Sequence, residues 1–145
     1  MAWVAYDAFK VNQFSSGLKP IDFSSTGDTI KVMLCTATYS PNQTTHATKA
    51  DVTNEVSGSN YAAGGVTLTQ KTATVSSHVL TFLSTSITWS QHASGFSNAR
   101  IAVMYRSTGG ADNVSVLIAY YDLASDRGNV AGDLVLGDPS GHFTI

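Results

Sequence analysis

Short runs of alternating apolar and polar residues, separated by turn residues, constrain the fold of this chain more than any other feature. Residues 29–37 read TIKVMLCTA and residues 99–106 read ARIAVMYR. A period of two places successive side chains on opposite faces of a β-strand, whereas a helix needs a period near 3.6. The same reasoning predicts further strands at 66–73, 78–83, 86–90 and 115–122, and two weaker ones at 133–136 and 142–145.

Turn residues punctuate these runs about every 8 to 12 positions, as in antiparallel hairpins. Gly, Asn, Asp, Ser and Pro gather at 24–28, 57–60, 64–65, 107–113 and 137–141. The pattern predicts an all-β fold, an antiparallel β-sandwich or barrel with long loops and room for one short N-terminal helix. One face of each sheet is expected to be buried and the other to face water.

A length of 145 residues predicts a single β domain covering 1–145. Within it, 1–28 is an N-terminal aromatic segment followed by a turn, and 40–65 is a long polar loop. The aromatic spacing at 3–14 fits a short amphipathic helix or an N-terminal strand. A helical turn at 51–55, capped by Asp51, is compatible with the loop. A loop of this length in a small domain is often functional.

Charge is sparse in this chain. Only 12% of residues are charged, about half the usual share, and the formal net charge is −2. The Lys and Arg residues stand singly, whereas nucleic acid binding requires clustered cations, so we predict no nucleic acid partner. No apolar run is long enough to span a membrane, and the opening residues do not resemble a secretory signal.

Residues that could carry catalysis or bind a metal are few. Cys35 lies within an apolar run and is predicted to be a buried, inert thiol. His46 with Asp51 could contribute to a metal site, but a plain loop histidine is the favoured interpretation. Glu55 is the single glutamate, and no Gly-x-Ser-x-Gly motif occurs. We therefore predict no enzymatic activity, no catalytic residues, no metal and no cofactor.

Aromatic residues are the main candidates for contacts with a partner protein. The candidates in the N-terminal segment and in or beside the long loop are Trp3, Tyr6, Phe9, Phe14, Tyr39 and Tyr61. For the N-terminal aromatics, packing against the chain's own core is an equal alternative. Trp89 and the pair Tyr120–Tyr121 lie on predicted strands, where core packing is favoured over an exposed platform for glycans.

Several segments, in order along the chain, resemble a widespread family of small virion proteins of tailed bacteriophages. An opening like Tyr6-Asp-Ala-Phe-Lys10 is typical of that family. The resemblance is carried further by 28–42 (DTIKVMLCTATYSPN), 51–68 (DVTNEVSGSNYAAGGVTL), 87–90 (ITWS) and 99–105 (ARIAVMY). It covers nearly the whole chain, although the loop at 46–50 and the end after Asp122 look individual.

The resemblance implies a phage structural protein that decorates or cements the capsid, and it supplies no catalytic residues. It also implies that 51–65 is a recurring structural loop that closes over the β core. The expected partners are the major capsid protein or other virion subunits, and the chain itself as a dimer or trimer. The expected location is the capsid surface of the virion, after synthesis in the bacterial host cytoplasm. The alternatives are a tail, neck or head-fibre component, or a glycan-binding virion module.

Overall fold

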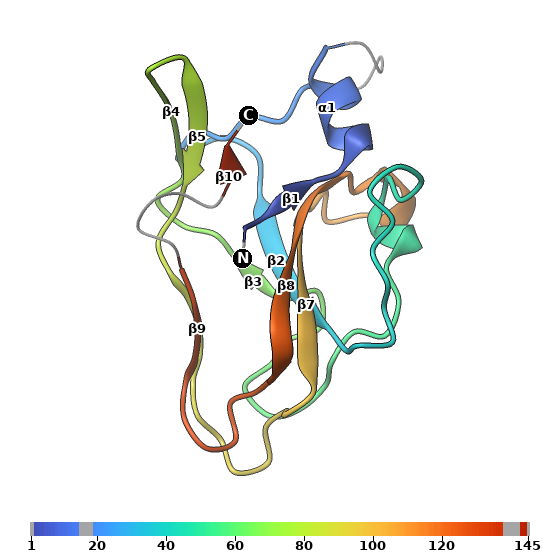
Figure 1. The fold of residues 1–145 in the computed structure, drawn as a ribbon, viewed down its shortest axis with the longest axis vertical. Helices are drawn as coiled ribbons and strands as arrows, with labels where there is room; N and C mark the ends of the chain where they lie inside the picture. Colours follow the sequence, from blue (N-terminus) through green and yellow to red (C-terminus); the bar gives the residue numbers. More distant parts are fainter. Residues whose placement is uncertain (1, 15–18, 138–142, 145) are drawn as a thin grey trace.

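The computed structural model describes residues 2–14, 19–137 and 143–144, and it confirms the all-β prediction (Figure 1). The largest sheet has five antiparallel strands in the order β1-β8-β7-β2-β3. Their bounds are β1 Val4–Ala5, β2 Ile30–Cys35, β3 Val66–Thr67, β7 Ala99–Arg106 and β8 Leu117–Arg127. The strands predicted at 29–37 and 99–106 form the centre of this sheet.

Two smaller sheets and short helical segments complete the described fold. One sheet has the order β10-β5-β4 and the other pairs β6 with β9. Their strands are β4 Thr72–Ser76, β5 Val79–Leu83, β6 Ile87–Trp89, β9 Leu134–Leu136 and β10 Phe143–Thr144. The helical segments are α1 Asp7–Phe14 and the 3-10 turns η1 Lys49–Asp51 and η2 Asp112–Val114. None of the described helices is long and apolar enough to cross a membrane.

The N-terminal segment realises both predicted alternatives, one after the other. β1 pairs with β8 through Val4 opposite Tyr120, and α1 begins two residues after β1 ends. In Figure 1, α1 and the hairpin of β4 and β5 lie at the same end of the molecule. The short strand therefore anchors the helix beside that hairpin.

The prediction of one strand at 66–73 is wrong, because β3 ends at Thr67 and the next strand, β4, begins only at Thr72. Gln70 has a φ of 51°, in the left-handed region, outside the extended conformation of a regular strand. β3 therefore ends in the large sheet, and β4 starts a different sheet. The alternation of apolar and polar residues continues on both sides of Gln70, so the pattern predicted one strand where the structure has two.

The prediction of one buried and one wet face is wrong for the central strands. Val32 and Leu34 pack into the larger core, while Met33 and Cys35, which point the opposite way, belong to a second buried cluster. Val52 from the long loop, together with Tyr6 and with Tyr39 just before the loop, covers that second face. The sheet is thus buried on both sides, because the loop at 40–65 closes over it.

The long loop is held by its own polar contacts. The Asp51 carboxylate accepts hydrogen bonds from the backbone N–H groups of Ala47 and Thr48, both at 2.9 Å. The helical turn is η1, which ends at Asp51, so the predicted turn at 51–55 is wrong. Asp51 bonds back to Thr48, the residue that precedes the turn, in the manner of a capping box.

Cys35 is fully buried, as predicted. Burial, with a smaller contribution from the negative charge of Glu55, raises the pKa of the Cys35 thiol to about 12. The thiol is therefore protonated at neutral pH and is a poor nucleophile.

Candidate partner-binding surface

The structure places three of the six candidate contact residues in the core of the chain itself. Tyr6, Phe9 and Tyr39 are between 0% and 3% exposed. The hydroxyls of Tyr6 and Tyr39 lie 3.0 Å apart in the second cluster, while Phe9 packs edge-on against Phe23. These side chains could reach a partner only if the domain opened, so we do not retain them as contact residues.

Trp3 and Tyr61 are half-buried and also serve the fold. The ring of Trp3 packs against that of Tyr121, with centroids 5.6 Å apart. The Tyr61 hydroxyl donates to Glu55 Oε1 at 2.7 Å and accepts the backbone N–H of Leu34 at 2.9 Å. Tyr61 therefore ties the long loop to β2.

Phe14 is the one candidate that stands fully in solvent. It is the last residue of α1, and 89% of its surface is exposed. Val11, one turn earlier on the same helix, is also exposed. An aromatic ring left in water at a helix end is unfavourable in the isolated chain, and burial against a partner would remove that cost.

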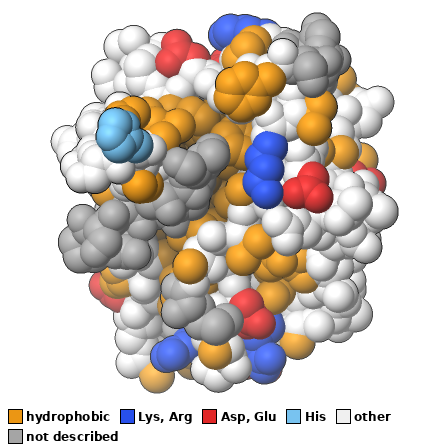
Figure 2. Space-filling view, turned by 45° about the horizontal axis from the view of Figure 1, so that its top comes forward, with side chains coloured by type: hydrophobic (Ala, Val, Ile, Leu, Met, Phe, Trp, Pro, Cys, Tyr) orange, Lys and Arg blue, Asp and Glu red, His pale blue; other side chains and the backbone are white. Residues whose placement is uncertain are grey.

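Phe14 stands at the rim of an apolar hollow between α1 and the hairpin of β4 and β5, which we call the hairpin–helix groove. Its volume is about 120 Å³. Figure 2, turned so that this end of the molecule comes forward, shows hydrophobic side chains gathered across it. The groove is lined by Phe9, Lys10, Gln13, Phe14, Phe23, Ala73, Leu80 and Phe82.

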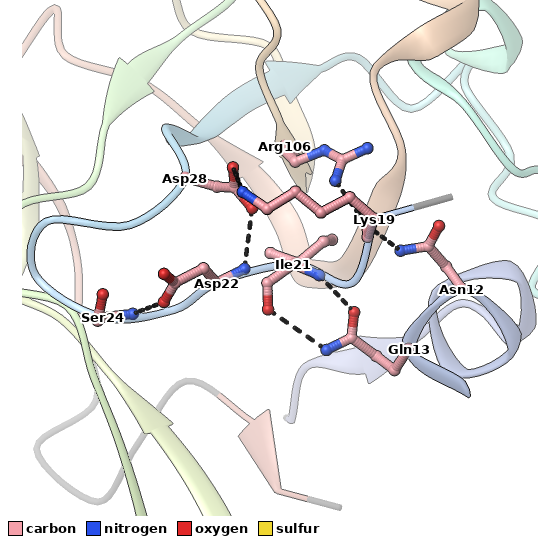
Figure 3. A network of polar contacts seen from close by, with 8 residues as sticks. All are labelled: Asn12, Gln13, Lys19, Ile21, Asp22, Ser24, Asp28 and Arg106. Carbon is pink, nitrogen blue, oxygen red and sulfur yellow. Dashed lines mark hydrogen bonds and ion pairs between the residues drawn. The ribbon is translucent and has the colours of Figure 1, made fainter. Parts of the chain in front are cut away.

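Polar contacts fix α1 as one wall of the groove (Figure 3). The Gln13 side chain accepts the backbone N–H of Ile21 at 2.8 Å and donates to the Ile21 carbonyl at 3.4 Å. The Lys19 carbonyl accepts from Asn12 at 3.4 Å and from Arg106 of β7 at 2.9 Å. The helix is thereby joined both to the following segment and to the central sheet.

The side chains of two aspartates hold the segment after α1 in a turn. Asp28 Oδ2 accepts the backbone N–H of Asp22 at 2.8 Å, and Asp22 Oδ1 accepts that of Ser24 at 2.9 Å (Figure 3). The hydrogen bonds from Ser24 lower the pKa of Asp22. This turn carries Phe23, whose ring contacts Phe82 with centroids 4.6 Å apart. It therefore supplies the floor of the groove.

The second wall is the tight hairpin of β4 and β5, of which the strand predicted at 78–83 contains β5, while the turn was not predicted. β4 and β5 are joined by Ser77 and His78, with φ of 49° and 67°. Two successive positive φ values define a type I′ turn, which normally carries Asn-Gly. Neither Ser nor His signals such a turn, so the pairing of β4 with β5 was not predicted. The available signal was the apolar alternation of Ala73 and Val75.

The groove is suited to apolar contacts. Phenylalanine, leucine and alanine side chains form most of its lining, and Lys10 at its edge pairs with Asp7 at 3.3 Å. No group of three or more His, Cys, Asp or Glu side chains that could hold a metal occurs within the described residues. The groove could take an aliphatic or aromatic side chain from another protein.

The long-loop residues considered for metal binding have other roles. His46 Nδ1 lies 3.1 Å from the Tyr39 hydroxyl and 3.3 Å from the backbone nitrogen of Asn42, which donates to it. Hydrogen bonds from Thr48 and Ala47 lower the pKa of Asp51. Both side chains hold the loop together, in line with the favoured interpretation.

The aromatics considered for glycan binding do not form a platform. Trp89 is 1% exposed and stacks on Tyr61 inside the larger core. Tyr120 and Tyr121 are half-buried and contact different partners, Tyr6 and Trp3 respectively. Adjacent strand residues point to opposite faces, so this pair cannot offer one flat stacking surface.

Comparisons with known proteins add no relative. No family model matches the chain, no curated protein matches it, and no solved structure matches it. The resemblance to phage virion proteins therefore remains an expectation from the sequence.

Proposed function

We propose that this chain is a structural protein of a tailed-bacteriophage virion, a cement or decoration protein that binds the outside of the assembled head and bridges capsid subunits. It is made in the bacterial host cytoplasm and resides on the capsid surface. Its partners are the major capsid protein or other virion subunits. The observation that carries this proposal is the apolar end of the molecule formed by α1 and the hairpin.

Exposed apolar side chains concentrate around the hairpin–helix groove. Phe14, Val11, Val75 and Leu80 are exposed large hydrophobic residues, the first two on α1 and the last two on the groove face of the hairpin. Exposed apolar side chains gathered at one end of a molecule are typical of protein contact sites. We propose that Phe14 and the groove form the contact with the head.

The charges of the chain also favour protein over nucleic acid as the partner. Lys10, Lys19, Lys49 and Arg100 each form an ion pair with an aspartate, and these pairs lie apart from one another along the sequence. Phosphate binding needs several free cations on one face. Repeated contacts between neutral surfaces, multiplied by capsid symmetry, can stabilise a shell even when each is small.

A tail, neck or head-fibre component is the second candidate. The same exposed Phe14 and groove would serve assembly with those subunits. The glycan-binding alternative loses support, because Trp89 is buried and Tyr120 and Tyr121 do not form a platform.

Copy number in the virion separates the two candidates. Quantitative mass spectrometry would compare this chain with the major capsid protein in purified virions and in emptied, tail-free heads. A cement protein is recovered with the heads at close to the stoichiometry of the capsid protein. Recovery of a few copies, lost with the tails, would overturn the cement function and support the alternative.

A further inference from the structure

The free edge of β4 differs from the other sheet edges of the described chain. β5 pairs with β10 on one side and with β4 on the other, so β4 ends its sheet. All five of its residues are exposed. The edge strands of the five-stranded sheet, β1 and β3, have two residues each. Short edges offer few free N–H and C=O groups, whereas β4 offers a full strand.

The hairpin of β4 and β5 carries none of the features that protect an edge from pairing. Residues 72–83 contain no Lys, Arg, Asp, Glu or Pro. Natural edge strands commonly carry a charge, a proline or a bulge, which prevents another strand from adding. A second strand that approaches β4 would therefore meet neither charge repulsion nor a missing donor.

The two faces of the hairpin differ in polarity. Ala73 lies opposite Phe82, and Val75 lies opposite Leu80, so these four side chains share one face. Ala73, Leu80 and Phe82 line the groove, which identifies this as the groove face. Val75 continues the same apolar face beyond the groove and is 69% exposed.

These features allow β4 to pair with the β4 strand of a second copy of the chain. In an antiparallel pair related by a two-fold axis, groove-face residues must stand opposite groove-face residues. The register centred on Thr74 meets this condition and pairs all five residues: Thr72 with Ser76, Ala73 with Val75, and Thr74 with its own copy. Registers centred on Ala73 or Val75 pair fewer residues. The uncharged edge is thus complementary to a second copy of itself.

We infer that two copies of this chain associate through antiparallel pairing of their β4 strands, centred on Thr74, to form one continuous sheet. Each exposed Val75 is then covered beside Ala73 of the other copy. Figure 1 shows the hairpin standing at the outer edge of the molecule, where a second copy can approach. The two-fold axis runs perpendicular to the sheet, so both grooves open on the same face.

This arrangement is independent of the proposed function and would add to it. Two grooves on one face of a dimer could engage two neighbouring capsid subunits at once, which raises the apparent affinity without new contacts. A contact of one short strand per copy is small, so the dimer should dissociate on dilution.

The first test is sedimentation velocity of the wild-type chain and two variants over roughly 5–500 µM, a range suited to a small interface. Wild type should shift from monomer to dimer as the concentration rises. Val75→Lys should weaken association roughly ten-fold or more by placing a charge on the edge. Val135→Lys is the matched control, a valine on β9 that is 54% exposed, and it should associate like wild type.

The second test fixes the register through disulfide formation. In the Thr74-centred pair, the two copies of residue 74 stand opposite each other at roughly 4.5–5.5 Å between Cα atoms, within disulfide reach. Thr74→Cys should therefore form a cross-linked dimer under mild oxidation. Thr72→Cys, on the same strand and face, should not, because its copies stand four residues apart. Cys35 is buried and leaves the new thiol as the reactive one.

A monomer at every concentration would overturn the inference, and so would cross-linking at residue 72 as efficient as at residue 74. If the chain is monomeric and Val75→Lys loses binding to heads, the edge accepts a strand of the capsid, and self-pairing is again overturned. Neither result bears on the copy number of the chain in heads, so the two proposals fail separately.

Discussion

At the scale of single residues, Gly65 is fixed by a close approach to β2. Its φ is 80°, and a Cβ at this position would collide with the carbonyl of Val32. Gly65→Ala should lower the free energy of unfolding by about 3 kcal/mol, measured by chemical denaturation. Gly109, with φ of 70° and open space around it, is the control, and Gly109→Ala should cost about 1 kcal/mol. Equal costs would contradict the role of the collision.

The Tyr61 hydroxyl bridges the long loop and β2. Tyr61→Phe removes the hydrogen bond to Glu55 and leaves the N–H of Leu34 without its acceptor. We expect a loss of about 1–3 kcal/mol in the free energy of unfolding, measured by denaturant titration. The control is Tyr121→Phe, whose hydroxyl has no hydrogen bond within the described residues. A neutral Tyr61→Phe variant would show that the bridge does not stabilise the loop.

Asp51 gives the chain a pH-dependent contribution to stability. Hydrogen bonds to its carboxylate lower the pKa of Asp51 in the folded state. The contribution is therefore present above the unfolded pKa, near pH 4, and is lost as the pH falls through the lower folded pKa. Asp51→Ala should be less stable than wild type at pH 7 by about 1 kcal/mol, and in thermal unfolding the two should converge only as the pH falls through the lowered folded pKa. A difference that persists in acid would contradict this assignment.

At the scale of elements, the hairpin turn is a site of strain. Ser77 and His78 both adopt left-handed backbone conformations, which disfavour side chains with a Cβ. The double variant Ser77→Asn/His78→Gly carries the residues that a type I′ turn prefers and should raise stability by about 1 kcal/mol in thermal unfolding. His78→Ala keeps the strain and should change little. A destabilised double variant would contradict the turn assignment.

The sequence predicted strands where the apolar residues of the pattern are also the residues that pack into the core. The strands at 29–37 and 99–106 were found because each carries apolar residues on the face that meets the larger core. The break at Gln70 and the turn at Ser77–His78 were missed, because neither position carries a glycine or asparagine that would announce a positive φ. Local sequence does not encode a conformation that tertiary packing imposes.

At the scale of the whole molecule, the candidate contact residues differ in burial: Tyr6, Phe9 and Tyr39 are buried, and Phe14 is exposed. The aromatic spacing left a short helix and a strand as alternatives, both of which occur, and it could not tell which residues face inward. Phe9 and Phe14 both line the groove, but Phe9 is buried against Phe23 whereas Phe14, the last residue of α1, is exposed; the hairpin that forms the other wall is distant in sequence. Phe23, Leu80 and Phe82 were not predicted as site residues, because the groove exists only once three separate segments meet.

The central claim, that the apolar end formed by α1 and the hairpin binds the phage head, is tested most directly by co-sedimentation with purified heads that lack this chain. Phe14→Ser should lower the affinity for heads roughly ten-fold or more while the free energy of unfolding stays unchanged, since the ring is in solvent. Val135→Ser should bind like wild type. Unchanged binding of Phe14→Ser, or an equal loss in both variants, would contradict the claim.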